Sequence, residues 1–88
     1  MSFQFDPNKT AVNQIKHGVS FADAEGVFYD DFAIHKTDSF SDDEERYIAI
    51  GLSNIGQLLV VVYTFRDDEI RLISARHATK YERKQYET

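Results

Sequence analysis

The sequence predicts an α+β fold: a small, mostly antiparallel sheet with two N-terminal helices and one C-terminal helix. Three observations lead to this prediction. The chain has 88 residues, the size of a single domain, so residues 1–88 are taken as one unit. Apolar residues follow helical spacing in the first third, and they alternate with polar ones in the middle. A helix-capping pair then stands near the end of the chain.

The first elements are a short strand at 2–5 and a helix at 7–17. Asp6 is suited to cap the helix, and Pro7 fits its first position. Gly18 suits the helix end. Within the helix, apolar residues recur at helical spacing, namely Ala11, Val12 and Ile15.

A second helix begins after Ser20 and ends at 29–31, with an apolar stripe of Phe21, Ala24, Val27 and Phe28. Four strands are then predicted at 32–37, 46–53, 58–65 and 70–76. The segment 38–45 is predicted to be an exposed acidic loop, and 54–57 and 66–69 are predicted turns. Thr79 and Glu82 form a capping box for a final helix at 80–87.

Regular alternation predicts which side chains share a face of the last two strands. It places Leu72, Ser74 and Arg76 on one face of strand 70–76, and Arg71, Ile73 and Ala75 on the other. In strand 58–65 and the following residue, one face carries Val60, Val62, Thr64 and Arg66. The sequence alone therefore separates Arg71 from Arg76.

Composition excludes several classes of protein. There is no cysteine, which rules out disulfide scaffolds and thiolate chemistry. The longest apolar run, 58–63, is far below the roughly 20 residues of a membrane span, and residues 1–6 have neither the basic start nor the apolar core expected of a signal peptide. We therefore expect a cytoplasmic protein without membrane contact. The three histidines lie on different elements, so no metal site is expected.

The net charge of −5 is unevenly distributed. Residues 21–45 contain nine acidic residues and one lysine, whereas 46–88 contain seven Lys or Arg and five acidic residues. An acidic stretch of this kind is typically a solvated surface. The overall negative charge therefore does not exclude a nucleic-acid partner.

The C-terminal quarter interleaves basic and aromatic residues. Arginine recognises phosphate in bidentate fashion, and tyrosine rings can stack on unpaired bases. Structural alternatives remain open for each residue: an ion pair for Arg76, helix-dipole stabilisation for His17, core packing for Tyr81, and a solvated helix surface for Lys80, Arg83 and Lys84.

Several motifs resemble the BrnT family, and together they cover nearly the whole chain. They are Phe5-Asp6-Pro7-Asn8-Lys9, Lys16-His17-Gly18-Val19-Ser20-Phe21, Glu45-Arg46-Tyr47-Ile48-Ala49-Ile50-Gly51, Leu59-Val60-Val61-Val62, and Ile73-Ser74-Ala75-Arg76-His77-Ala78 followed by Glu82-Arg83 and Tyr86. One departure is Phe5, where many relatives have tryptophan.

The resemblance implies a RelE-like toxin of a type II toxin–antitoxin system that cleaves RNA without metal or cofactor. The 2′-hydroxyl attacks the adjacent phosphate, and arginines stabilise the developing charge. A BrnA-type ribbon-helix-helix antitoxin is the implied partner, in a two-to-two complex. By position in the motifs, the implied catalytic residues are Arg76, Arg83, His17, Lys16, Thr64 and Arg66, and the implied RNA-binding residues are Lys80, Tyr81 and Tyr86.

Two alternatives remain open from the sequence. The first is a catalytically inactive RelE-like module that only holds an antitoxin. The second is a toxin of this fold whose target is not RNA, such as a topoisomerase. Neither the general acid nor the general base is assigned.

Overall fold

A computed structural model describes residues 1–38 and 45–88. The predicted exposed acidic loop at 38–45 falls mostly outside the described residues. The elements follow the order β1 (Phe3–Gln4), α1 (Pro7–His17), α2 (Phe21–Ala24), η1 (Glu25–Tyr29), β2 (Ile34–Thr37), β3 (Tyr47–Leu52), β4 (Leu58–Arg66), β5 (Glu69–His77) and α3 (Lys80–Glu87). The predicted α+β class is confirmed.

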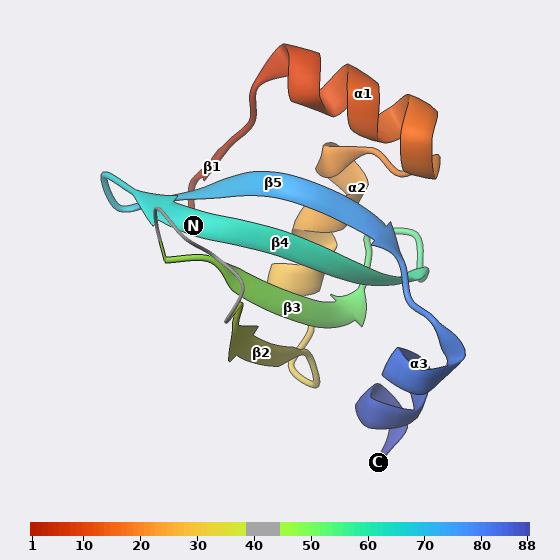
Figure 1. Cartoon of the computed structure of the whole chain (residues 1–88). Helices are drawn as coiled ribbons and strands as arrows, with labels where there is room; N and C mark the ends of the chain where they lie inside the picture. The colour runs from red at the N-terminus through yellow and green to blue at the C-terminus, as the bar shows by residue number, and fades with distance from the viewer. Residues whose placement is uncertain (39–44) are drawn as a thin grey trace.

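The strands form one sheet in the order β1-β5-β4-β3-β2. All neighbouring pairs are antiparallel except β1, which pairs with β5 in parallel. Figure 1 shows α1 next to the β5 edge of the sheet, with α2 and η1 crossing behind the sheet. Helix α3 lies beyond the C-terminal end of β5. The predicted two N-terminal helices and one C-terminal helix are present, although the second continues as a 3-10 helix.

The main core lies between the sheet and the α2–η1 segment. Phe21, Ala24 and Val27 are fully buried against apolar residues of the three central strands, which are Ala49, Leu59, Val61, Tyr63, Ile70, Leu72 and Ala75. A second, smaller cluster lies on the other side of the sheet. It joins Ile50, Leu58 and Val60 to Ala78 and Tyr86, so α3 packs on the face opposite α2. The sheet is therefore covered from both sides at one end.

Helix α1 begins and ends as predicted. The Asp6 side chain accepts a hydrogen bond from the Asn8 N–H, and Gly18 ends the helix with a φ of 68°, which favours glycine. Its apolar residues, however, do not enter the core, since Val12 and Ile15 are 61% and 87% exposed. The buried residue of this helix is the polar Asn13.

Asn13 fixes α1 to the edge of the sheet through its side-chain amide. Its Nδ2 donates to the carbonyls of Ala75 (2.8 Å) and Val19 (3.0 Å), and its Oδ1 accepts from the Ala75 N–H (3.1 Å). The amide thus pairs with both backbone groups of Ala75, as a neighbouring strand would. It extends the short β1 pairing along the outer edge of β5.

The predicted alternation along β5 is wrong, because the strand contains a β-bulge. Val62 pairs with Ser74 and Tyr63 pairs with Leu72, which leaves Ile73 as an extra residue. An extra residue reverses the faces of everything beyond it. Leu72 therefore lies on the same face as Ala75 in the main core, and Arg71 lies on the same face as Arg76.

We predict that Asn13→Ala lowers the free energy of unfolding by about 2–3 kcal/mol, because it leaves buried backbone groups of Ala75 without partners. Urea denaturation followed by circular dichroism measures the change. Gln14→Ala, on the exposed side of α1, is the matched control and is expected to change stability by less than about 0.5 kcal/mol. Equal stabilities of the Asn13 and Gln14 variants would show that the amide pairing does not hold α1.

Candidate nucleic-acid interface

The side of the sheet on which α3 packs collects most of the basic strand residues. We call this surface the α3 face. Alternation and register place there residues that include Lys36 of β2, Ile48 and Ile50 of β3, Val60, Val62, Thr64 and Arg66 of β4, and Glu69, Arg71, Ser74 and Arg76 of β5. Arg46, directly before β3, follows the same alternation. The face therefore has an apolar middle with cationic side chains around it.

The bulge determines which arginines reach this face. Arg76 pairs with Val60, and Arg71 pairs with Thr64, four residues further along β4. Cross-strand partners point to the same side, so the two arginines share the face at a spacing of about 13 Å along the strand. If the strand alternated regularly through Ile73, Arg71 would point into the main core.

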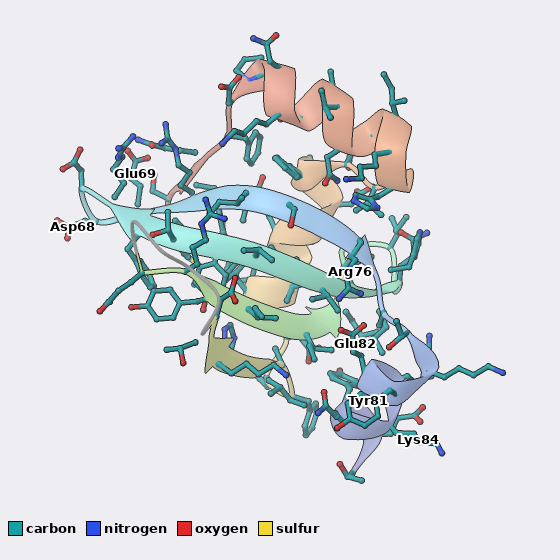
Figure 2. The ribbon with its side chains drawn as sticks, in the orientation of Figure 1. Asp68, Glu69, Arg76, Tyr81, Glu82 and Lys84 are labelled. Carbon is teal, nitrogen blue, oxygen red and sulfur yellow. The ribbon has the colours of Figure 1, made fainter. Side chains whose placement is uncertain are left out.

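Arg76 forms a bidentate ion pair with Glu82 at the start of α3 (Figure 2). Its two terminal nitrogens each lie 2.8 Å from a Glu82 carboxylate oxygen. Hydrogen bonding to this carboxylate raises the pKa of Arg76. On the other side of the pair, the hydrogen bonds from Arg76, assisted by the Thr79 backbone N–H, outweigh desolvation and lower the pKa of Glu82 to about 2. The guanidinium of Arg76 is therefore already paired with a carboxylate of the same chain, that of Glu82.

The predicted capping box at the start of α3 is also the support of this ion pair. Thr79 N–H donates to Glu82 Oε1 (2.8 Å), and Glu82 N–H donates back to Thr79 Oγ1 (3.2 Å). Glu82 thus caps its own helix and holds Arg76 at the same time. The orientation of the guanidinium is coupled to the first turn of α3.

Tyr86 anchors the other end of α3. It packs against the cluster of Ile50, Leu58 and Val60, and its hydroxyl donates to Asp30 Oδ2 at 2.6 Å. This hydrogen bond raises the pKa of Tyr86 to about 12. The same carboxylate oxygen accepts from the Leu52 N–H (2.9 Å). Tyr86, a predicted base-stacking residue, is therefore engaged in packing α3.

The remaining predicted site residues of this region differ in their exposure to solvent and in their contacts. Thr64 is buried, and its hydroxyl donates to the Glu45 carbonyl at 2.6 Å. Arg66 is exposed at the end of β4, where it pairs in register with Glu69. Three predicted residues of α3 are exposed, namely Lys80, Tyr81 and Arg83. Figure 2 shows Tyr81 on α3, away from the far end of the sheet where Asp68 and Glu69 lie.

The structure places Lys16 and His17 away from α3. They line a pocket of about 330 Å³ between α1 and β5, together with Lys9, Val12 and other residues of these two elements, namely Asn8, Asn13, Ile73 and Ser74. The predicted site residues therefore fall into two groups. Thr64, Arg66 and Arg76 belong to the α3 face, whereas Lys16 and His17 belong to the α1 side of β5.

Two basic residues of the α3 face were missed by the sequence prediction. Arg71 was assigned to the opposite side, because a bulge leaves no signal in an alternating strand. For Arg46, the sequence predicts only the first residue of a strand. In the structure Arg46 Nε is buried and has no hydrogen-bond partner among the described residues.

The charge of this surface favours anions. Within residues 1–38 and 45–88, Arg76–Glu82 is the one ion pair between side chains, which leaves Arg46, Arg66 and Arg71 without a carboxylate at ion-pair distance. The same residues contain no group of three or more His, Asp or Glu that could hold a metal ion. Nor does any helix in this part of the chain have the length and apolar character needed to cross a membrane.

A small α+β domain with a cationic sheet face is a structure suited to binding phosphate groups, and comparison with known families gives its class. Residues 5–82 match the model of a family described as a ribonuclease toxin of type II toxin–antitoxin systems. That family is BrnT, and the chain belongs to it, as the sequence motifs predicted. Arg83 and Tyr86 lie just beyond the matched residues.

A solved structure supports the same assignment. The crystal structure of the Brucella abortus ribonuclease toxin BrnT is similar to this chain, with a TM-score of 0.68 and 29% sequence identity. The similarity covers 91% of this chain and 99% of the Brucella protein. None of the curated proteins matches the chain significantly.

We predict that the Arg76–Glu82 pair makes the domain sensitive to acid. The pKa of Glu82 falls from its ordinary 4.5 to about 2 on folding, so its contribution is present above pH 4.5 and is lost as the pH falls toward 2. Because Arg76 is 40% exposed, we expect a contribution of about 1–2 kcal/mol, less than a dry pair would give.

The test compares the stability of the parent and of Glu82→Gln by urea denaturation at pH 7, 4 and 2.5. The difference is expected to be about 1–2 kcal/mol at pH 7 and to shrink toward pH 2.5. Glu87→Gln changes an exposed carboxylate of the same helix and should show no such pH dependence. A difference between parent and Glu82→Gln that stays constant with pH would contradict the assigned role of the pair.

Proposed function

We propose that this BrnT-family chain is a metal-independent endoribonuclease whose phosphate-binding surface is the α3 face. The family match carries the proposal, because a ribonuclease toxin must bind a polyanion. The arginines of the α3 face support it from the structure, since Arg71 and Arg76 share one side of β5. Of the three readings left open by the sequence, this one agrees best with the family.

The chemistry that suits these residues is attack of a 2′-hydroxyl on the adjacent phosphate. The 2′-oxygen forms a bond to phosphorus, the 5′-oxygen leaves, and a 2′,3′-cyclic phosphate results. Negative charge grows on the phosphate oxygens during this step, and guanidinium groups stabilise it. Arg71 has no carboxylate at ion-pair distance among the described residues, and Arg76 reaches the phosphate when it exchanges the Glu82 carboxylate for a phosphate oxygen.

Proton transfer needs a base and an acid of suitable pKa. Glu82 is poorly suited as the base, because its pKa of about 2 makes its carboxylate a weak proton acceptor while Arg76 holds it. Glu82 instead positions Arg76. Lys16 and His17 take part in proton transfer only if the RNA extends over β5 to the α1 side. Lys80, Tyr81 and Arg83 flank the α3 face as further RNA contacts.

A type II toxin has a cognate antitoxin, and membership of this family implies one here. We propose that it is a BrnA-type ribbon-helix-helix protein in a two-to-two complex, and that the toxin acts in the cytoplasm, where its RNA substrate lies.

We predict that the purified chain cleaves single-stranded RNA in the presence of a chelator. Arg76→Ala and Arg71→Ala are each expected to reduce the cleavage rate by about 100-fold or more, the effect of removing one charge-stabilising group. Gel analysis of a labelled RNA measures the rates. Lys84→Ala, which removes an exposed cation from α3, is the matched control and should stay within about threefold of the parent.

The folded state of each variant is checked by its melting temperature. If folded Arg71 and Arg76 variants cleave as fast as the parent, the α3 face is not the site. A parent chain that cleaves no RNA but binds its antitoxin would support the inactive module instead, and inhibition of a topoisomerase without RNA cleavage would support the other alternative.

A further inference from the structure

The pocket between α1 and β5 has a composition that the proposed catalytic face does not explain. Its apolar lining comes from Val12 of α1 and Ile73 of β5, and three basic residues also line it, namely Lys9, Lys16 and His17. The apolar side chain of Val12 is 61% exposed to solvent. The pocket therefore combines exposed apolar surface with positive charge.

The fold itself creates this pocket. Asn13 holds α1 to β5 without using the apolar residues of the helix, so Val12 stays outside the core. The bulge adds Ile73, whose half-buried side chain lines the pocket. Bulges commonly redirect a side chain in this way. Two independent features thus bring apolar side chains to the same exposed place.

We propose that this pocket docks the cognate antitoxin through an acidic segment with an aliphatic anchor. Exposed apolar residues grouped on a small domain are typical of protein-binding surfaces. Val12 and Ile73 form the seat for the anchor, and Lys9, Lys16 and His17 attract the acidic flanks. The proposal rests on the chain being the toxin of a type II system, which implies such a protein partner.

RNA fits this pocket less well than a protein segment. None of the residues lining it is Phe, Tyr or Trp, so it offers none of the rings that usually stack on bases. Phosphates would satisfy the lysines but would leave Val12 and Ile73 uncovered. An acidic segment with a Leu or Ile anchor satisfies both parts of the pocket. When this segment is docked, another part of the antitoxin, or its overall size, would keep RNA away from the α3 face.

The test measures binding of the antitoxin expressed from the same operon to the full-length toxin by titration calorimetry. Val12→Glu removes the apolar seat and repels an acidic segment, so we expect binding to weaken by about 10- to 100-fold. Lys9→Glu is expected to weaken it by about 10-fold and to reduce its dependence on salt. Ile55→Glu, with 63% exposure in the β3–β4 turn, is the matched control and should bind like the parent.

RNA cleavage by the free variants separates this proposal from the proposed function. Val12→Glu is expected to cleave RNA at the parent rate while escaping neutralisation. Antitoxin binding at parent strength by both Val12→Glu and Lys9→Glu would overturn the docking site, even if the chain is a ribonuclease. Loss of RNA cleavage by folded Val12→Glu with unchanged antitoxin binding would overturn it in favour of RNA. A parent that cleaves no RNA would refute the proposed function. The antitoxin binding of Val12→Glu and Lys9→Glu would still decide for or against the docking site.

Discussion

The pairing of the Asn13 amide with both backbone groups of Ala75 is the interaction on which the arrangement around β5 depends. β1 protects only the first part of this edge, at Ile70 and Arg71. Asn13 closes the edge further along, and between the two lies the bulge at Ile73. Because this amide attaches α1 to β5, the helix is held in place while Val12 and Ile15 stay outside the core. One buried polar side chain therefore holds the helix, the strand edge and the pocket between them.

The bulge and the Arg76–Glu82 pair together explain how an acidic protein presents a cationic surface. The net charge of the chain is −5, but the acidic residues concentrate in 21–45. The bulge brings Arg71 to the side of Arg76, and Glu82 offsets only one of these charges. The result is a limited positive surface. Such a surface binds RNA in a way that salt weakens strongly.

Local signals predicted most of the fold from the sequence. The caps at Asp6, Gly18 and Thr79 fixed the helix limits, because each satisfies backbone groups next to it in the chain. The bulge was not predictable, since it depends on pairing between strands, and its omission misplaced Arg71. The burial of Asn13 and the exposure of Val12 were missed for a related reason. Helical spacing marks an apolar side of a helix but does not say whether the domain or a partner covers it.

Phosphate binding by the α3 face requires Arg71 and Arg76 to contact the same RNA. Nuclear magnetic resonance of the 15N-arginine-labelled chain, titrated with a non-cleavable 2′-O-methyl RNA, observes this directly through the side-chain Nε–H signals. Shared contact predicts that the signals of Arg71 and Arg76 shift together at the same RNA concentrations, and the Arg76 signal then reports the exchange of Glu82 for phosphate. Saturation of the chain with RNA while both signals stay unchanged would contradict it.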